Sequence, residues 1–360
     1  MGLYFVLAAI FIFTLFVYTP LPTTYDHQRD ALVKHVAGAT TAITKSAPHY
    51  PATLETTKSK YAFATLLASD AQHPDDQDNL HDEYFIATRL LAYQILHAPE
   101  TRSKDNIPFI VLATKGVSEA KRDRLRRDGA IVLAVETITK PAWVEAGASN
   151  WEEVFDKLRL WELVQFERIC FLDGDTVLNR PLDGVFLDPA AASPQETLNL
   201  DNPSSSDNDN ETPLPATYVF AGQPEMNRAH HYPPSEATHD YPNIHYLNAG
   251  FFVLQPSLPL LHHYLQILSV PNSFVPKFPE QNLLNFAHRS AEEGGRMPWS
   301  RLGTEWNLHY PTRADLEGGV ASLHEKWWAP SDEEGLGPYL RSWRWRMEGF
   351  YEGLDREGLR

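Results

Sequence analysis

The chain has 360 residues, of which 43% are hydrophobic and 12% aromatic, enough for one large domain or two small ones with a buried core. Its formal net charge of −16 comes from 31 Lys and Arg against 47 Asp and Glu, so it lacks the positive surface on which general nucleic-acid binding depends. The single cysteine, Cys170, lies in an apolar run and rules out an internal disulfide.

The N-terminus carries an apolar segment. Residues Leu3 to Tyr18 contain no charge and are rich in Phe, Leu, Ile and Val, and Pro20 ends the run. As a helix the segment would be about 24 Å long, the short end of a membrane span. No small-residue cleavage site follows it, so we expect a signal anchor over residues 1–20, with a cleaved signal peptide as the alternative. Residues 21–57, rich in Thr, Ala, Lys and Pro, predict a stem.

From residue 58 strands and helices alternate. The apolar pattern predicts strands over 61–67, 109–113, 130–135 and 168–172, and helices over 82–97, 118–127 and 151–166. The last of these helices is predicted from residues spaced along one apolar face, namely Trp151, Val154, Phe155, Leu158 and Trp161. This alternation predicts an α/β fold with a mainly parallel sheet and helices on both faces. In such sheets ligands bind at the carboxyl ends of the strands.

The second half of the chain begins with a polar stretch. Residues 190–216 are rich in Ser, Asn, Asp and Pro and predict a disordered insert, which carries the glycosylation sequon at Asn210. Beyond it we expect a strand over 251–254 and helices over 258–268 and 280–287. Residues 331–360 predict a C-terminal helical extension, in which the segment Trp343 to Arg346 packs its aromatic side chains.

The pattern Asp-x-Asp occurs three times, and only one copy follows a predicted strand. Asp76-Gln77-Asp78 and Asp207-Asn208-Asp209 lie in polar runs, whereas Asp173-Gly174-Asp175 follows the apolar run 168–172. Two carboxylates at the edge of a core repel each other unless a cation lies between them, and hard oxygen ligands suit Mg²⁺ or Mn²⁺ bridging a diphosphate. Gly174 allows a tight turn and leaves room for a ligand. The alternative is that these residues form a solvated turn at the end of a strand and have no functional role.

A phosphatase of the haloacid-dehalogenase type is a second enzyme class to weigh. The segment Phe171 to Leu178 fits its opening motif, with Asp173 as the nucleophile and Asp175 as the acid/base. That class needs a later acidic pair after another strand to complete its Mg²⁺ site. The carboxylates at 332–334 do not follow an apolar run, so this requirement is not met.

Several motifs together resemble glycosyltransferase family 8, of the glycogenin type. They cover residues 58–330 in the family's order: Lys157 to Trp161, Ile169 to Leu178, Arg180 to Asp183, Asn248-Ala249-Gly250 before an apolar strand, Glu280 to Asn285, and His324 before Trp327-Trp328. The chain departs from the family at Glu280, where the family has Asp, and around Lys326, where the final motif lacks its glycine.

This resemblance implies a GT-A-like catalytic domain over 58–330. It implies transfer of a sugar from a UDP-sugar (UDP-GlcNAc, UDP-glucose or UDP-galactose) to a glycan hydroxyl, with Mn²⁺ or Mg²⁺ and retention at the anomeric carbon. With the apolar N-terminus, it implies a Golgi membrane enzyme with a single span and a luminal catalytic domain. A degenerate member that binds nucleotide-sugar without turnover is the non-enzymatic alternative.

The residues that the resemblance assigns fall into three groups. The metal ligands are Asp173, Asp175 and His324. The catalytic residues are Lys157, which stabilises the departing diphosphate, Glu280 and Asn248, which orient the sugar, and Gln281, which faces the reacting carbon. The donor-binding residues are Thr65, Leu66, Ala68, Ser69, Tyr84, Asp173, Gly174, Asp175, Ala249, Gly250 and Lys326.

Overall fold

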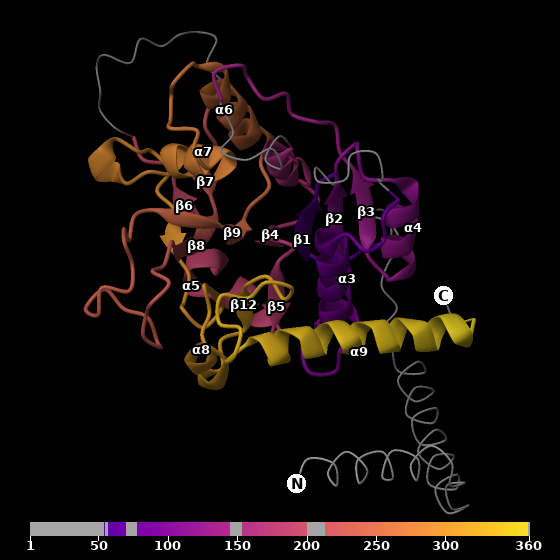
Figure 1. Cartoon of the computed structure of the whole chain (residues 1–360). Helices are drawn as coiled ribbons and strands as arrows, with labels where there is room; N and C mark the ends of the chain where they lie inside the picture. The colour runs from indigo at the N-terminus through magenta and orange to yellow at the C-terminus, as the bar shows by residue number, and fades with distance from the viewer. Residues whose placement is uncertain (1–53, 55–56, 70–77, 145–152, 200–212, 359–360) are drawn as a thin grey trace, which may run out of the picture. The chain divides into compact units, whose positions relative to one another are not determined.

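The computed structural model describes residue 54 and residues 57–69, 78–144, 153–199 and 213–358 (Figure 1). The expected anchor at 1–20 lies outside the described residues, as does nearly all of the expected stem at 21–57. Among the described residues, no helix combines the length and the apolar character needed to cross a bilayer.

A seven-stranded sheet forms the centre of the fold (Figure 1). Its order is β10-β8-β9-β4-β1-β2-β3, with bounds β1 Tyr61–Leu67, β2 Phe109–Ala113, β3 Ile131–Ala134, β4 Arg168–Leu172, β8 Phe220–Pro224, β9 Leu247–Leu254 and β10 Ser300–Arg301. Apolar runs such as β2 and β4 are buried along their whole length, as expected of strands covered on both faces. The predicted α/β class is confirmed. The sheet is mixed, because β9 runs antiparallel to both β4 and β8.

Helices cover both faces of this sheet. One hydrophobic cluster includes side chains from α6 (Leu258–Ser269), α7 (Pro279–Ala287) and the 3₁₀ helix η3 (Val154–Glu162). The cluster on the other face includes side chains from α3 (Glu83–Leu96), α4 (Glu119–Arg127), η4 (Asp183–Leu187) and α5 (Pro189–Ala192). Side chains cap four of these helices at their N-termini, namely Asp82 at α3, Ser118 at α4, Asp188 at α5 and Ser257 at α6.

The helix predicted over 151–166 is shorter than expected, and it is a 3₁₀ helix. Its polar residues explain the difference, because Asp156 and Lys157 are both buried and bound to other parts of the fold. The Asp156 carboxylate accepts from the backbone N–H of Ile138 at 2.6 Å, and Lys157 points toward the end of β4. The segment is therefore held by contacts on more than one side, and the one-faced α-helix that the apolar spacing predicts does not form.

A smaller sheet of order β11-β12-β5 packs beside the main one. It consists of β11 (Asn307–His309), β12 (Ser322–His324) and β5 (Thr176–Leu178). In the antiparallel pair of β12 with β5, His324 lies opposite Thr176. This register brings the end of β12 next to the Asp173-Gly174-Asp175 turn, which immediately precedes β5.

Ordered structure extends into both ends of the predicted insert 190–216. The guanidinium of Arg168 donates to the carbonyl of Ala191 at 3.0 Å, and β6 (Gln195–Glu196) pairs with β7 (Thr217–Tyr218). These contacts hold the chain up to residue 199 and again from residue 213, so the two flanks of the insert are structured. Its central part, 200–212, lies outside the described residues.

A buried histidine connects the two helices of the first cluster. His288 caps the C-terminus of α7, and its imidazole is fully buried. Its Nδ1 lies 2.6 Å from the carbonyl oxygen of Met297, and its Nε2 lies 2.6 Å from the hydroxyl of Tyr264 on α6. A carbonyl can only accept, so Nδ1 carries the proton and Nε2 accepts from Tyr264.

The C-terminal helix α9 (Gly337–Arg356) is part of the same folded unit. It lies against α3, and Figure 1 shows it as the long yellow helix next to α3. Leu340, Trp343, Met347 and Tyr351, spaced on one face of α9, are buried in a third cluster that includes Tyr93 of α3. The predicted packing of aromatic side chains here is found for Trp343, whereas Trp345 is 62% exposed.

Candidate active site

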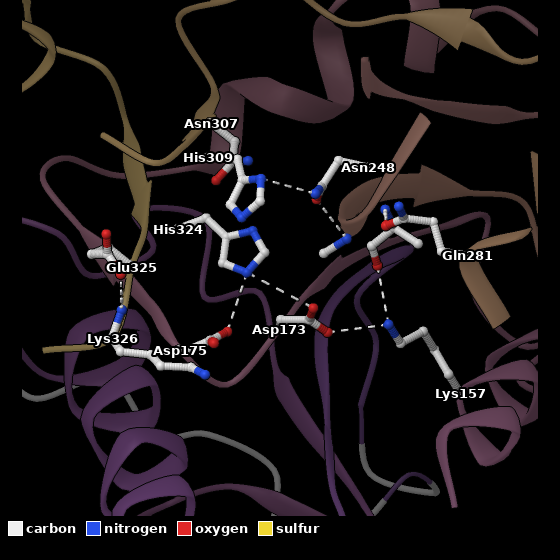
Figure 2. Close-up of polar contacts among 12 residues, drawn as sticks. Lys157, Asp173, Asp175, Asn248, Gln281, Asn307, His309, His324, Glu325 and Lys326 are labelled. Atoms are coloured by element: carbon white, nitrogen blue, oxygen red, sulfur yellow. Dashed lines mark hydrogen bonds and ion pairs between the residues drawn. The ribbon is translucent and has the colours of Figure 1, made fainter. Parts of the chain in front are cut away.

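Three segments distant in the sequence meet at the carboxyl end of β4 (Figure 2). The first is the turn 173–175, which follows β4 directly. The second is Asn248-Ala249-Gly250, at the start of the antiparallel strand β9, and it is joined to the first by a hydrogen bond of 2.8 Å from Asp173 N to Gly250 O. The third is the end of β12, with His324.

Asp173, Asp175 and His324 form a compact cluster. His324 Nε2 lies 3.2 Å from Asp175 Oδ1 and 3.9 Å from Asp173 Oδ2, and Figure 2 shows both carboxylates directed at the same ring nitrogen. One ligand atom from each residue lies within 4.8 Å of the other two. Two carboxylates and an imidazole are a donor set that could hold a divalent metal ion.

Gly250 makes this cluster possible. A Cβ atom at residue 250 would lie 2.1 Å from His324 Cε1, 2.7 Å from His324 Nδ1 and 2.9 Å from Asp173 Oδ2. Any side chain at this position would therefore displace two of the three candidate ligands. A glycine is required here because the side chains of His324 and Asp173 lie too close for a Cβ atom. The sequence motif indicates the glycine but not this reason.

Lys157 is buried and holds two of the acidic side chains. Its Nζ lies 3.1 Å from Asp173 Oδ1, 3.1 Å from Glu280 Oε1 and 3.1 Å from the carbonyl of Ala249. An ammonium group has three N–H donors, and here each has an acceptor. Lys157 therefore positions Asp173 and Glu280, and its expected contact with the diphosphate stays a prediction. The same contacts pair Glu280 with a fixed cation.

Burial and charge set the protonation of the cluster. Burial raises the pKa of Asp173, and the opposing effects of Lys157 and His324 do not cancel this. Burial acts in the same direction on Asp175, but His324 and Lys326 outweigh it and lower its pKa to about 2. The pKa of Lys157 is raised, because its two carboxylate partners outweigh the effect of burial. The two carboxyl groups of the turn therefore differ: burial disfavours the charged form of Asp173, whereas the cationic neighbours of Asp175 keep it ionised.

Two polar residues that the sequence analysis did not single out join the site. Glu225 Oε1 lies 2.6 Å from His309 Nδ1, and its Oε2 accepts from Asn248 Nδ2 at 2.9 Å. Glu225 directly follows the buried strand β8, but the sequence of β8, Phe-Ala-Gly-Gln-Pro, is not an apolar run and predicts no strand to search from. His309 ends a strand of three residues, too short for a signal in the sequence.

The donor-binding residues expected in the first half of the chain differ in position: some lie at the strand end near the 173–175 turn, and others pack in the core. β1 and β4 are parallel, so Ala68 and Ser69 follow β1 at the edge where the 173–175 turn lies. Thr65 is fully buried, and its hydroxyl has no partner among the described residues. The Ser69 hydroxyl donates to Glu153 at 2.7 Å, and Leu66 packs against the core.

Tyr84 and Lys326 lie together beside this turn. The Lys326 ammonium is 5.7 Å from the centre of the exposed Tyr84 ring, which also contacts Trp328 edge-on at 5.2 Å. Burial lowers the pKa of Lys326, but Tyr84 and Asp175 outweigh burial, so the net shift is upward. Lys326 is therefore a fixed positive charge next to Asp175, in reach of an anionic ligand of the cluster.

Sequence relatives of the chain include glycosyltransferases. The uncharacterized protein C4C3.09 of Schizosaccharomyces pombe is 31% identical over 313 residues, covering 81% of this chain and 78% of its own. Galactinol synthase 10 of Arabidopsis thaliana is 25% identical over 255 residues, covering 64% and 71% respectively. No protein-family model matches the chain.

Among solved structures, the galactosyltransferase LgtC in complex with donor and acceptor sugar analogues is similar to 79% of this chain and 95% of its own. The identity is 14% and the TM-score 0.44, too distant to transfer any residue of its site. The relatives matched by sequence are glycosyltransferases where their activity is named, and none of those cited is a phosphatase. The interpretation of Asp173 as a phosphatase nucleophile therefore has no support beyond its local motif.

Proposed function

Because the chain belongs to the family of Schizosaccharomyces pombe protein C4C3.09 and is a glycosyltransferase similar to family 8, we propose that it transfers a hexose from a UDP-sugar to a glycan hydroxyl with retention. The donor is UDP-GlcNAc, UDP-glucose or UDP-galactose, and the fold is GT-A-like. The observation that carries the proposal is the cluster of Asp173, Asp175 and His324 at the carboxyl end of β4.

In this proposal Asp173, Asp175 and His324 hold Mn²⁺, with Mg²⁺ as the substitute. Bound there, the ion neutralises the charge on the diphosphate of the donor and of the leaving UDP. Lys326, half-buried beside Asp175, adds a second positive charge on the same side. Tyr84 next to it, and Ala68 and Ser69 at the end of β1, bind the uridine.

The sugar lies on the other side of Asp173, among Asn248, Glu280 and Gln281. Lys157 keeps Glu280 and Asp173 in place through contacts of 3.1 Å each. A carboxylate bound to a buried ammonium is a weak nucleophile but a good acceptor for sugar hydroxyls, so Glu280 orients the donor. Positioned polar groups of this kind are commonly worth about 10²–10³ in rate.

Retention then follows from attack on the same face of the sugar as the leaving group. The acceptor hydroxyl oxygen bonds to the anomeric carbon while the bond from that carbon to the diphosphate oxygen breaks. The proton of the hydroxyl passes to the departing diphosphate. No carboxylate of the chain is needed as a nucleophile in this scheme, in agreement with the pairing of Glu280 to Lys157.

We further propose a Golgi membrane enzyme, anchored by residues 1–20, with the catalytic domain in the lumen. The support is the uncharged run from Leu3 to Tyr18. Since this run lies outside the described residues, the proposal rests on the sequence alone.

A screen of UDP-sugars for hydrolysis with Mn²⁺, in the absence of acceptor, tests the reaction. The expected result is release of UDP from one of the three donors and its loss in Asp175→Asn. Calorimetry of UDP binding with and without Mn²⁺ tests the metal site separately. UDP binding without turnover of any donor would identify the chain as a degenerate binding protein. Mn²⁺ dependence that survives in Asp175→Asn would show that the metal lies elsewhere.

A further inference from the structure

We propose that His309 and Glu225 are positioning residues for sugar transfer, which fix the side-chain amide of Asn248 in the orientation that the sugar meets. The inference rests on the proposed function, because it concerns the same donor sugar. Neither residue belongs to the motifs that indicate family 8.

Glu225 is the common partner of both amides. Its Oε2 accepts from Asn248 Nδ2 at 2.9 Å and from Gln281 Nε2 at 3.5 Å. The oxygens of the two amides point the opposite way, toward the backbone: Asn248 Oδ1 accepts from Gly250 N, and Gln281 Oε1 accepts from Ala249 N, each at 2.9 Å. The Asn248 amide is therefore held at both ends, by β9 on one side and by Glu225 on the other. The Gln281 amide has a second acceptor, the Tyr246 hydroxyl, at 3.1 Å.

The position of Glu225 is in turn set by His309. Its Oε1 lies 2.6 Å from His309 Nδ1, the shortest contact that the carboxylate makes. Burial raises the pKa of Glu225, but the contacts with His309 and Asn248 outweigh burial and lower it. Glu225 is therefore a carboxylate, and His309 Nδ1 carries the proton between them. The 3.3 Å between Asn248 Nδ2 and His309 Nδ1 is then a contact between two donors, so Glu225 is the acceptor that keeps them together.

His309 itself has little freedom to turn. Its ring is stacked on Tyr310, with 3.8 Å between the ring centres. The ring centres of His309 and its other neighbour, His324, are 4.8 Å apart, and Figure 2 shows these two imidazoles side by side. Tyr310 has a backbone φ of 55°, unusual for a bulky residue, and the guanidinium of Arg228 covers its ring at 4.4 Å. The imidazole is thus clamped between an aromatic ring and the candidate metal cluster, with its Nδ1 directed at Glu225.

The consequence for the reaction is a fixed pattern of donors and acceptors around the sugar. If Glu225 turned away, the amide nitrogen of Asn248 would lose its acceptor and the amide could rotate by 180°. Gln281 would stay in place, because its Nε2 also donates to the Tyr246 hydroxyl at 3.1 Å. A flip of the Asn248 amide exchanges a donor for an acceptor at the position of a sugar hydroxyl. Loss of an outer partner of this kind typically costs about 10- to 100-fold in activity.

Three substitutions at residue 309 separate the hydrogen bond from the packing. His309→Phe keeps a planar ring without a donor, and His309→Asn places an amide nitrogen near the position of Nδ1. His309→Gln is the matched control, because its amide lies one bond further out. We expect kcat to fall about 10- to 100-fold in the Phe and Gln variants and to recover most of this loss in the Asn variant. Affinity for UDP with Mn²⁺ should stay within about threefold throughout. His262→Phe, an exposed histidine on α6, serves as the unaffected reference.

Two kinetic results would overturn the inference: a kcat of His309→Phe within about twofold of the original protein, or equal losses in all three variants, which indicate packing alone. If His309→Phe does not fold, the Asn and Gln variants still decide. The side-chain amide NMR signal of Asn248, recorded without ligand, should shift in His309→Phe and return in His309→Asn. This readout does not depend on turnover. Absence of activity in the original protein would thus refute the proposed function, and an unmoved amide signal would refute the inference.

Discussion

Lowering the pH from 7 to 5 should destabilise the fold through His288. Burial lowers the pKa of this imidazole from 6.5 to about 3, although its hydrogen bond to Met297 acts in the opposite direction. Protonation would place a charge in the core and turn Nε2 into a donor facing the Tyr264 hydroxyl. His288 caps α7, so the effect concerns the helix that begins with Glu280 and Gln281.

The sign follows from the protons bound in each state. Below about pH 6.5 the unfolded chain protonates residue 288, whereas the folded chain does so only near pH 3. In this window the unfolded state binds more protons, so stability rises with pH and is lost as the pH falls. Between pH 7 and pH 5 the loss from this one group amounts to about 2 kcal/mol.

Urea denaturation at both pH values, on the original protein and on His288→Gln, measures this contribution. Other groups titrate in the same range: burial raises the pKa of Asp156 to about 6, which has the opposite sign, and lowers that of His263 to about 4. These groups are present in both proteins and largely cancel in the difference. We expect the variant to be less stable at pH 7 but to lose about 2 kcal/mol less on acidification. An equal loss in both proteins would refute the assignment of a neutral, buried His288.

Four further predictions concern the site and the termini. Gly250→Ala should reduce Mn²⁺-dependent activity by at least about 10²-fold, because the added Cβ would lie 2.1 Å from His324 Cε1. An unchanged Mn²⁺ affinity by calorimetry would contradict this. Glu280→Gln should reduce turnover only in part and yield no glycosyl azide when azide is added, whereas an inverted azide product would identify a nucleophile. Alkaline carbonate should leave the intact protein in the membrane pellet, and its release would favour a cleaved signal peptide. Deleting residues 200–212 should cost less than about 1 kcal/mol in urea unfolding, because shortening a long polar segment changes little; a larger loss would mean that the segment is structural.

The strands of the first half of the fold could be predicted because burial on both faces leaves a continuous apolar run. The runs 61–67, 109–113 and 168–172 are found as β1, β2 and β4 with the same bounds. The direction of a strand, by contrast, depends on the connection before it. β9 has the same apolar character as β4 and runs the other way, so nothing in its own sequence indicates that the sheet is mixed.

Residues of the candidate site that fall in motifs could be predicted from the sequence. Residues whose role depends on tertiary contacts could not. The meeting of the 173–175 turn with residues 248–250 and His324 agrees with the motif order. The role of Lys157 depends on its three acceptors at 3.1 Å, which come from segments up to 123 positions away in the sequence. His309 and Glu225 are 84 positions apart and share no motif. Their pairing joins the end of β11 to the end of β8, strands of two different sheets, which a single sequence does not reveal.

The helix α9 has a practical consequence for work with shortened chains. The similarity to family 8 ends near residue 330, and a boundary drawn there would look natural from motifs alone. Such a chain would lack Leu340, Trp343, Met347 and Tyr351, and the apolar surface of α3 that they cover would face water. Exposed patches of this kind promote aggregation. Recombinant expression should therefore keep the chain through residue 358, with any purification tag beyond it, so that insolubility caused by a missing helix is not mistaken for an intrinsic property of the enzyme.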